Sequence, residues 1–196
     1  MKKIIILILL AMGMQGLPAQ EVESSLGEAR QAWDKGELEN TRHALQQALY
    51  ELDIAIGKEI LKLLPENMGT MQYKEEKEEV GSASLGYAGL YVSRAYAGHE
   101  DTDASLQIIA DSPLLAGVNA LLALPVIGDP NRKRIRVGTY RAVLIKSEDD
   151  DGALSWGVQV PFGASLLNFS VNGVTEKEVV DMANTIPLEQ IARLIQ

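Results

Sequence analysis

Few side chains in this chain of 196 residues carry the chemistry of a familiar catalytic site. The chain has no cysteine, so thiol catalysis is excluded and only His43 and His99 could serve as imidazole bases. His43 falls beside the apolar stripe of a helical segment, which is typical of a partly exposed structural residue. His99 lies near Glu100, Asp101 and Asp103, a cluster that could bind a divalent cation but whose composition is more typical of a solvated turn.

The sequence motifs of established catalytic and metal sites do not occur in this chain. The stretch SASLG at 82–86 lacks the first glycine of G-x-S-x-G, and S-x-x-K, H-E-x-x-H and G-x-x-x-x-G-K-[ST] are all missing. The stretch SEDDDG at 147–152 matches an EF-hand-type calcium loop at Asp149, Asp151 and Gly152, but Ser147 and Val158 occupy its first and last ligand positions. We therefore predict no catalytic residue, no metal ligand and no cofactor. A carboxylate pair assembled by the fold stays open, because such acids are paired in space and not in sequence.

One basic cluster, Arg132, Lys133, Arg134 and Arg136, stands in an acidic chain. There are 18 Lys and Arg residues against 27 Asp and Glu residues, and a net charge of −9 excludes a general nucleic-acid binder. On a strand, Arg132, Arg134 and Arg136 share one face while the residues between them turn to the other face. Two interpretations remain open: a solvated edge paired with the domain's own carboxylates, or a contact for an anionic envelope ligand or acidic partner.

Residues 1–19 have the pattern of a secretory signal peptide. Lys2 and Lys3 precede an apolar run over residues 4–14, and we place cleavage after the small residue Ala19. The run is shorter than the roughly 20 residues that a membrane-spanning helix needs, so we expect no transmembrane segment after cleavage. Without cysteine the protein cannot be a lipoprotein anchored at its cleavage site. We predict a periplasmic or secreted bacterial protein.

Residues 21–65 have the apolar periodicity of a helical hairpin. The first stripe has +4, +3, +4 spacing: Val22, Leu26, Ala29 and Trp33. The second combines +4 and +3 spacing and ends before Pro65: Leu45, Leu49, Leu52, Ile56, Ile60 and Leu63. Gly36 is expected at the turn between the two helices. Gly57 lies within the second helix, where a glycine costs about 1 kcal/mol of stability relative to Ala, and this cost indicates a close contact with a neighbouring element. We expect this helix to pack across a sheet through Leu45, Leu52 and Ile56.

The rest of the chain predicts an α+β fold, with residues 20–196 forming a single domain. Residues 66–84 are expected to be a connector. Residues 85–196 are expected to form an antiparallel sheet of about five strands with one crossover helix, 113–124, and C-terminal helices. Alternation places Trp156 and Phe169 on one buried face, and Thr175 with Glu178 predicts a capping box at the start of the first C-terminal helix.

Three stretches resemble known proteins. ARQAWDKGELENTRHALQQAL, residues 29–49, resembles the turn region of a tetratricopeptide repeat, although no second copy follows at a period near 34. DSPLL at 111–115 and GVTEKEVVDMA at 173–183 resemble a group of uncharacterised bacterial envelope proteins. The order of elements is loosely similar to Mog1/PsbP-like domains. That similarity implies a small binding or assembly factor and transfers no catalytic residue.

These observations support a non-catalytic secreted or periplasmic protein that binds a protein partner or envelope ligand. The competing hypothesis is a hydrolase that uses carboxylates or an atypical serine arrangement, and a third is an assembly factor acting through the helical hairpin. A deep cavity that gathers two or more acids, or Ser with Lys or His, would favour the hydrolase. A shallow apolar surface would favour binding.

Overall fold

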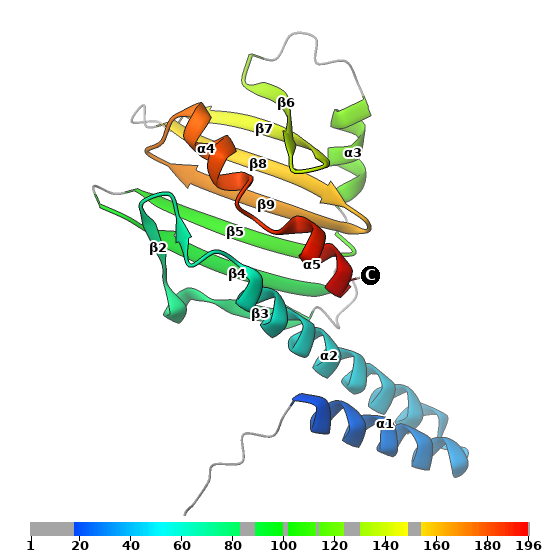
Figure 1. Cartoon of the computed structure of the whole chain (residues 1–196). Helices are drawn as coiled ribbons and strands as arrows, with labels where there is room; N and C mark the ends of the chain where they lie inside the picture. Colours follow the sequence, from blue (N-terminus) through cyan, green and yellow to red (C-terminus); the bar gives the residue numbers. More distant parts are fainter. Residues whose placement is uncertain are drawn as a thin grey trace, which may run out of the picture. The chain divides into compact units, whose positions relative to one another are not determined.

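A computed structural model shows an α+β protein with two N-terminal helices, a nine-stranded antiparallel sheet and C-terminal helices (Figure 1). The structure describes residues 18–82, 89–99, 102–112, 114–123, 130–148 and 154–195. The chain divides into two compact units, residues 1–48 and 49–196. Of the predicted leader, only Pro18 and Ala19 are among the described residues, at the start of α1 (Pro18–Asp34).

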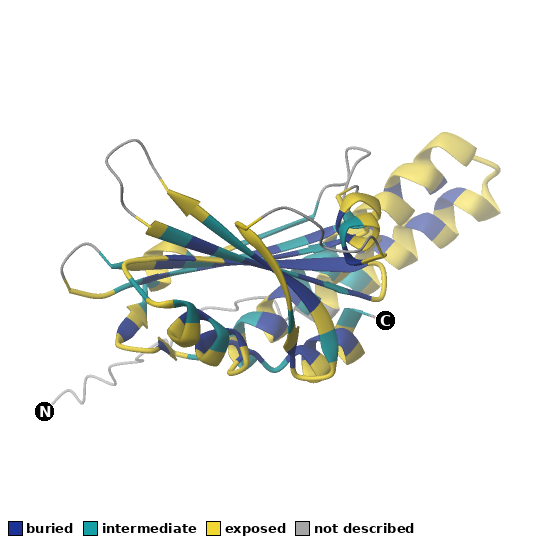
Figure 2. Cartoon of the chain, turned by 90° about the horizontal axis from the view of Figure 1, so that it is seen from above, coloured by how far each residue is buried: buried dark blue, intermediate teal, exposed yellow. Residues whose placement is uncertain are grey.

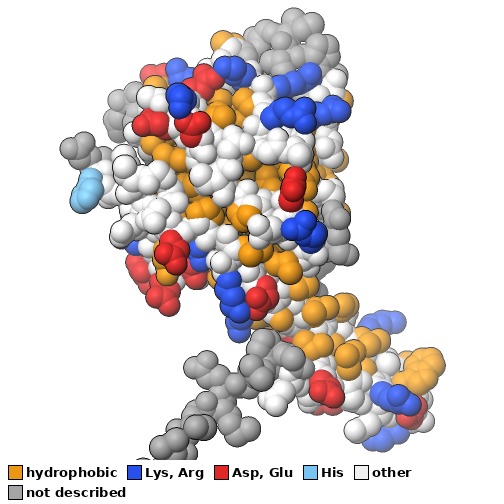
Figure 3. All heavy atoms as spheres, viewed as in Figure 1, with side chains coloured by type: hydrophobic (Ala, Val, Ile, Leu, Met, Phe, Trp, Pro, Cys, Tyr) orange, Lys and Arg blue, Asp and Glu red, His pale blue; other side chains and the backbone are white. Residues whose placement is uncertain are grey.

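The first unit is a helical hairpin of α1 and the beginning of α2 (Leu38–Leu63), which lie side by side (Figures 1 and 2). Gly36 takes the left-handed conformation at the turn, with φ +76°, as predicted. Among the described residues of this unit, the buried ones are all small: Ser25, Ala29, Ala32, Thr41, Ala44 and Ala48. The large apolar side chains are exposed instead, and Figure 3 shows hydrophobic side chains on the surface of the hairpin.

The second unit contains the sheet. Its strands are β1 (Asn67–Met68), β2 (Met71–Tyr73), β3 (Glu79–Ser82), β4 (Leu90–Ala97), β5 (Asp103–Ala110), β6 (Arg132–Val137), β7 (Tyr140–Glu148), β8 (Leu154–Phe162) and β9 (Ser165–Asn172). The spatial order is β1-β2-β4-β5-β9-β8-β7-β6, and β3 also pairs with β4. All pairs are antiparallel.

The expectation of about five strands is too low. The segment 66–84, expected to be a connector, contributes β1, β2, β3 and the short 3-10 helix η1 (Glu75–Lys77). The chain turns between β6 and β7 at Gly138, where φ is +56°. Strands of two to four residues are too short to show a two-residue period. Here β2 and β3 pair with β4, and β1 pairs with β2.

Helices cover both faces of the sheet (Figure 2). On one face, the end of α2, α4 (Glu176–Ala183) and α5 (Leu188–Ile195) enclose the main core. On the other, α3 (Leu115–Ala123) packs through Val118 and Leu122 onto Val143 and Leu166. The capping box of α4 is confirmed, and the hydrogen bonds from the Thr175 backbone N–H and hydroxyl lower the pKa of Glu178.

The main core confirms part of the sequence prediction. Trp156 and Phe169 lie on the same buried face, and Trp156 Nε1 donates to the Val174 carbonyl at 3.0 Å. Ile56 of α2 packs against this core, as expected, but Leu45 and Leu52 are 45% and 43% exposed, so their predicted burial against the sheet is wrong. The periodicity of a helix shows which residues share a face, but it does not show how far along the helix that face is covered.

Gly57 lies where α2 meets the sheet, which explains a glycine inside a helix. A Cβ atom at this position would stand 2.3 Å from Val80 Cγ1 and 3.1 Å from Leu90 Cδ1. The close approach predicted from the sequence is therefore present, with β3 and β4 as the neighbouring elements.

We expect Gly57→Ala to lower the free energy of unfolding by about 1 kcal/mol or more, because overpacking outweighs the gain in helix propensity. Gly117→Ala in α3 is the matched control, since a Cβ there meets nothing within 4 Å, and it should leave stability unchanged or raise it slightly. Urea unfolding of both variants measures the difference. Equal stability of the two variants would contradict this account of Gly57.

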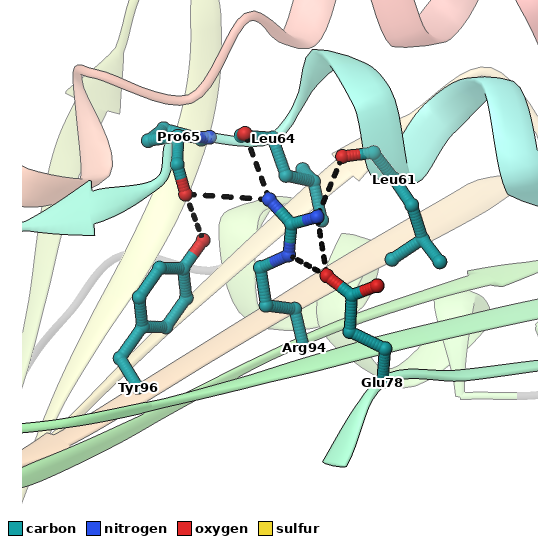
Figure 4. A network of polar contacts seen from close by, with 6 residues as sticks. All are labelled: Leu61, Leu64, Pro65, Glu78, Arg94 and Tyr96. Carbon is teal, nitrogen blue, oxygen red and sulfur yellow. Dashed lines mark hydrogen bonds and ion pairs between the residues drawn. The ribbon is translucent and has the colours of Figure 1, made fainter. Parts of the chain in front are cut away.

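Arg94 of β4 attaches the end of α2 to the sheet (Figure 4). Its guanidinium donates to the carbonyl oxygens of Leu61 and Leu64, each at 2.8 Å, and more weakly to that of Pro65. Nε donates to Glu78 at 2.7 Å, and the group also forms an ion pair with this carboxylate. All of these contacts are buried or partly buried.

Two aromatic rings complete the surroundings of Arg94. The guanidinium carbon lies 4.7 Å from the centroid of the Tyr73 ring, a cation–π geometry. The Tyr96 hydroxyl donates to the Pro65 carbonyl at 2.9 Å, and burial raises the pKa of Tyr96 to about 12. Carbonyl groups that end α2 without helical partners are thereby satisfied by side chains of one strand.

We expect Arg94→Met to lower the free energy of unfolding by about 3 kcal/mol or more, because Glu78 and the carbonyls of α2 lose their partner in a buried site. Lys62→Met is the control: Lys62 pairs with Glu59 at 2.6 Å, but both side chains are more than half exposed, so the expected change is under about 1 kcal/mol. Chemical denaturation measures both values. A similar loss of stability in the two variants would show that the buried Arg94 contacts stabilise the fold no more than an exposed ion pair does.

The boundary between the units leads to a prediction about fragments. Residues 49–196 keep Ile60 of α2 and Leu64 just after it, which are buried in the main core, and the carbonyls that Arg94 binds. We expect this fragment to unfold cooperatively. The fragment 66–196 loses these contacts and should aggregate, because apolar core surface becomes exposed. Thermal unfolding and size-exclusion chromatography test both fragments, and a soluble, cooperatively melting 66–196 would contradict the prediction.

Candidate functional site

The predicted basic cluster lies on β6, at one edge of the sheet. Arg132, Arg134 and Arg136 are exposed and share one face of the strand, while Ile135 packs against the main core and Val137 belongs to it. Lys133, between Arg132 and Arg134, is exposed. Figure 3 shows Lys and Arg side chains gathered in this part of the surface. The strand therefore has the predicted two-sided arrangement.

Several of these cations have partners within the chain. Arg136 donates to the Thr139 carbonyl at 3.1 Å, and Lys133, on the other face, forms an ion pair with Glu176. Arg134 reaches the Leu121 carbonyl at 3.5 Å, which is a weak contact. An arginine side chain has five N–H donors, more than these local contacts use. Binding of an anion on this face of β6 therefore stays a proposal.

The histidines do not form a site among the described residues. His43 is exposed on α2 and His99 is exposed after β4. Glu100 and Asp101 lie outside the described residues, and Asp103 accepts a hydrogen bond from Asn172 at 2.9 Å. Within the described ranges no group of three or more His, Asp or Glu residues could hold a metal ion. The calcium-loop residues Asp149, Asp151 and Gly152 also fall outside those ranges.

A cavity of about 420 Å³ opens at one end of the sheet in the second unit. Its floor is formed by residues at neighbouring ends of four strands: Leu90, Ala110, Ser165 and Phe162. The α2 helix contributes Leu49, Asp53 and Ile56, and α5 contributes Ala192 and Ile195. The cavity is therefore a cleft between two helices above the ends of β4, β5, β9 and β8.

Two carboxylates, Asp53 and Asp111, lie in this otherwise mainly apolar lining. The Ser82 hydroxyl donates to Asp53 Oδ2 at 2.5 Å, which fixes the rotamer of this acid. Asp111 is the one non-glycine residue of the described chain with positive φ, +50°, a conformation that Asp tolerates better than most residues. Gly89 lies close to it, since a Cβ there would stand 3.3 Å from Asp111 Oδ2.

Neither of these two acids is among the site residues predicted from the sequence. Asp53 lies between stripe positions of α2 and Asp111 follows the end of β5, so the residues come from distant segments. The sequence signal for Asp111 as a site residue is weak, because this residue comes just before the predicted helix 113–124. Only the fold shows that both acids line one cavity.

A second cavity of about 420 Å³ surrounds Arg94 and Glu78. Its buried charges already neutralise one another and stabilise α2, as described above. The cleft of Asp53 and Asp111 is different, because no Lys, Arg or His is found among the described residues of its lining. It combines an apolar surface with negative charge that the lining does not neutralise.

No family model, curated protein or solved structure matches this chain. The resemblances to bacterial envelope proteins, Mog1/PsbP-like domains and a tetratricopeptide repeat therefore stay predictions. Among the described helices, none is both long enough and apolar enough to cross a membrane.

Proposed function

We propose that this chain is a non-catalytic secreted or periplasmic envelope protein that binds a protein partner through its helical hairpin. The observation that supports this function is the exposure of large apolar side chains in the first unit. The exposed fractions are 50% for Leu26, 63% for Trp33, 66% for Leu38 and 45% for Leu45. Single exposed leucines are ordinary, but a group of this size on two short helices is typical of an interaction surface.

Helix geometry gathers these residues on two faces. Leu26 and Trp33 are two turns apart on α1, and Leu38 and Leu45 are two turns apart on α2, so each pair shares one side of its helix. The small buried residues, such as Ala29 and Ala44, already hold the two helices together. The large side chains are therefore not needed inside the hairpin and remain available for another surface.

The expected partner has a complementary apolar surface. Burying a Leu or Trp side chain fully contributes about 1.5–3 kcal/mol, so a few anchors are enough for a specific complex once the costs of association are subtracted. Tryptophan is also enriched among the residues that dominate binding energy. The signal-peptide pattern and the tetratricopeptide-like turn support an envelope protein that acts through a helical surface.

The double variant Trp33→Ser, Leu38→Ser tests this function. Both side chains are more than 60% exposed, so we expect unchanged folding and at least a tenfold weaker affinity for the partner. Cross-linking in the intact envelope, with a C-terminal tag, identifies the partner, and calorimetry with the purified partner measures the affinity.

Leu154→Ser is the control, because Leu154 is exposed at 39% on β8, outside the hairpin. It should bind the partner like the unchanged protein. If the double variant and the control give the same cross-links and affinities, the hairpin is not the binding surface. The hydrolase alternative has an observation in its favour, because one cavity gathers two acids, Asp53 and Asp111. A hydrolytic activity that is lost in both Asp53→Asn and Asp111→Asn would support the hydrolase over the non-catalytic protein.

A further inference from the structure

We propose that the cleft between α2 and α5 binds an amphipathic cation, meaning a primary or secondary amine carried on an apolar body. This ligand site is separate from the hairpin and does not depend on the function proposed for it. Three features support the site: its size, its apolar lining and its two carboxylates.

The size of the cleft fits a small organic molecule. Its volume, about 420 Å³, lies within the range of roughly 300–1,000 Å³ found for small-molecule sites. Ile56 and Ile195 approach it from the two helices, and Leu90 and Phe162 form part of the floor. These side chains favour an aliphatic or aromatic body over a sugar or a free ion, because apolar groups cannot replace the hydrogen bonds of a polar ligand.

The charge of the cleft selects the head group. Asp53 and Asp111 are the two charged residues in the part of the lining that the structure describes, and neither forms a salt bridge with a described Lys, Arg or His. A carboxylate accepts several hydrogen bonds, so the bond from Ser82 leaves Asp53 with free acceptor positions. An ammonium group donates up to three charge-assisted hydrogen bonds and therefore matches two carboxylates across a cleft.

A bare metal ion fits this cleft less well. Calcium takes six to eight oxygen ligands, whereas the lining offers two carboxylates and the hydroxyl of Ser165 amid apolar groups. The apolar body of an organic amine, in contrast, covers the floor and walls that an ion would leave exposed. An anionic or neutral ligand would leave both carboxylates, the half-buried Asp53 and the exposed Asp111, without a counter-charge in the cleft.

Calorimetry on the full-length protein tests the site with three probes of similar shape: 2-phenylethylamine, 2-phenylethanol and 3-phenylpropionate. We expect saturable one-to-one binding of the amine, at least tenfold weaker binding of the alcohol, and no binding of the acid. Equal affinities of amine and alcohol, or no saturable binding of the amine at millimolar concentration, would overturn the proposal.

Substitution of the two acids tests the same site. Asp53→Asn and Asp111→Asn should each weaken binding of the amine at least tenfold. The control Asp34→Asn removes one negative charge from an exposed position on α1 and should leave the affinity unchanged. Undiminished affinity in both cleft variants would show that the carboxylates do not bind the amine.

Methyl NMR of the unchanged protein covers the case in which a cleft variant fails to fold. The δ1 methyl signals of Ile56 and Ile195 should shift on addition of the amine, while that of Ile135 on β6, remote from the lining, should not. Shifts confined to residues outside the cleft would overturn the proposal. These experiments do not involve the hairpin. The proposal for the cleft and the proposal for the hairpin can therefore each fail while the other holds.

Discussion

The position of α2 on the sheet depends on one buried cation, the guanidinium of Arg94. A buried charge is costly unless each donor finds an acceptor, and here the carbonyls of Leu61 and Leu64 and the carboxylate of Glu78 supply them. The acceptors come from the end of α2 and from the chain before β3, so one side chain of β4 fixes both to the sheet. The cleft in turn depends on this arrangement, because α2 forms one of its walls.

Local features of the fold could be predicted from the sequence because their causes are local. Thr175 and Glu178 are three residues apart and complete a capping box by themselves, and the alternation around Trp156 reports a strand with one buried face. The strands β1, β2 and β3 could not be predicted, since they are stabilised by pairing with neighbouring strands and not by their own pattern: β2 and β3 pair with β4, and β1 pairs with β2. The juxtaposition of Asp53 and Asp111 depends on the packing of α2 over the end of β5, which no spacing encodes.

The helix α2 shows how one apolar repeat can serve several purposes. Ile60 is fully buried in the core, Asp53 interrupts the apolar surface at the cleft, and Leu45 is exposed in the hairpin. The single period predicted one buried face along the whole helix, whereas Leu45 and Leu52 on that face are exposed. The proposed binding function rests on exposed residues of the hairpin, among them Leu45. A position where the predicted burial is wrong is thus one that the proposal uses.

The basic residues of β6 have a further consequence for how this sheet meets other proteins. An outer strand offers unpaired backbone N–H and C=O groups to which a strand of another chain can add, and closely spaced charges discourage that addition. Four of the six residues of β6 are Arg or Lys, and at the other margin β1 and β3 have only two and four residues. Charges on one outer strand and the shortness of the others disfavour the addition of strands from other chains to the described sheet, and with it the aggregation that such addition starts.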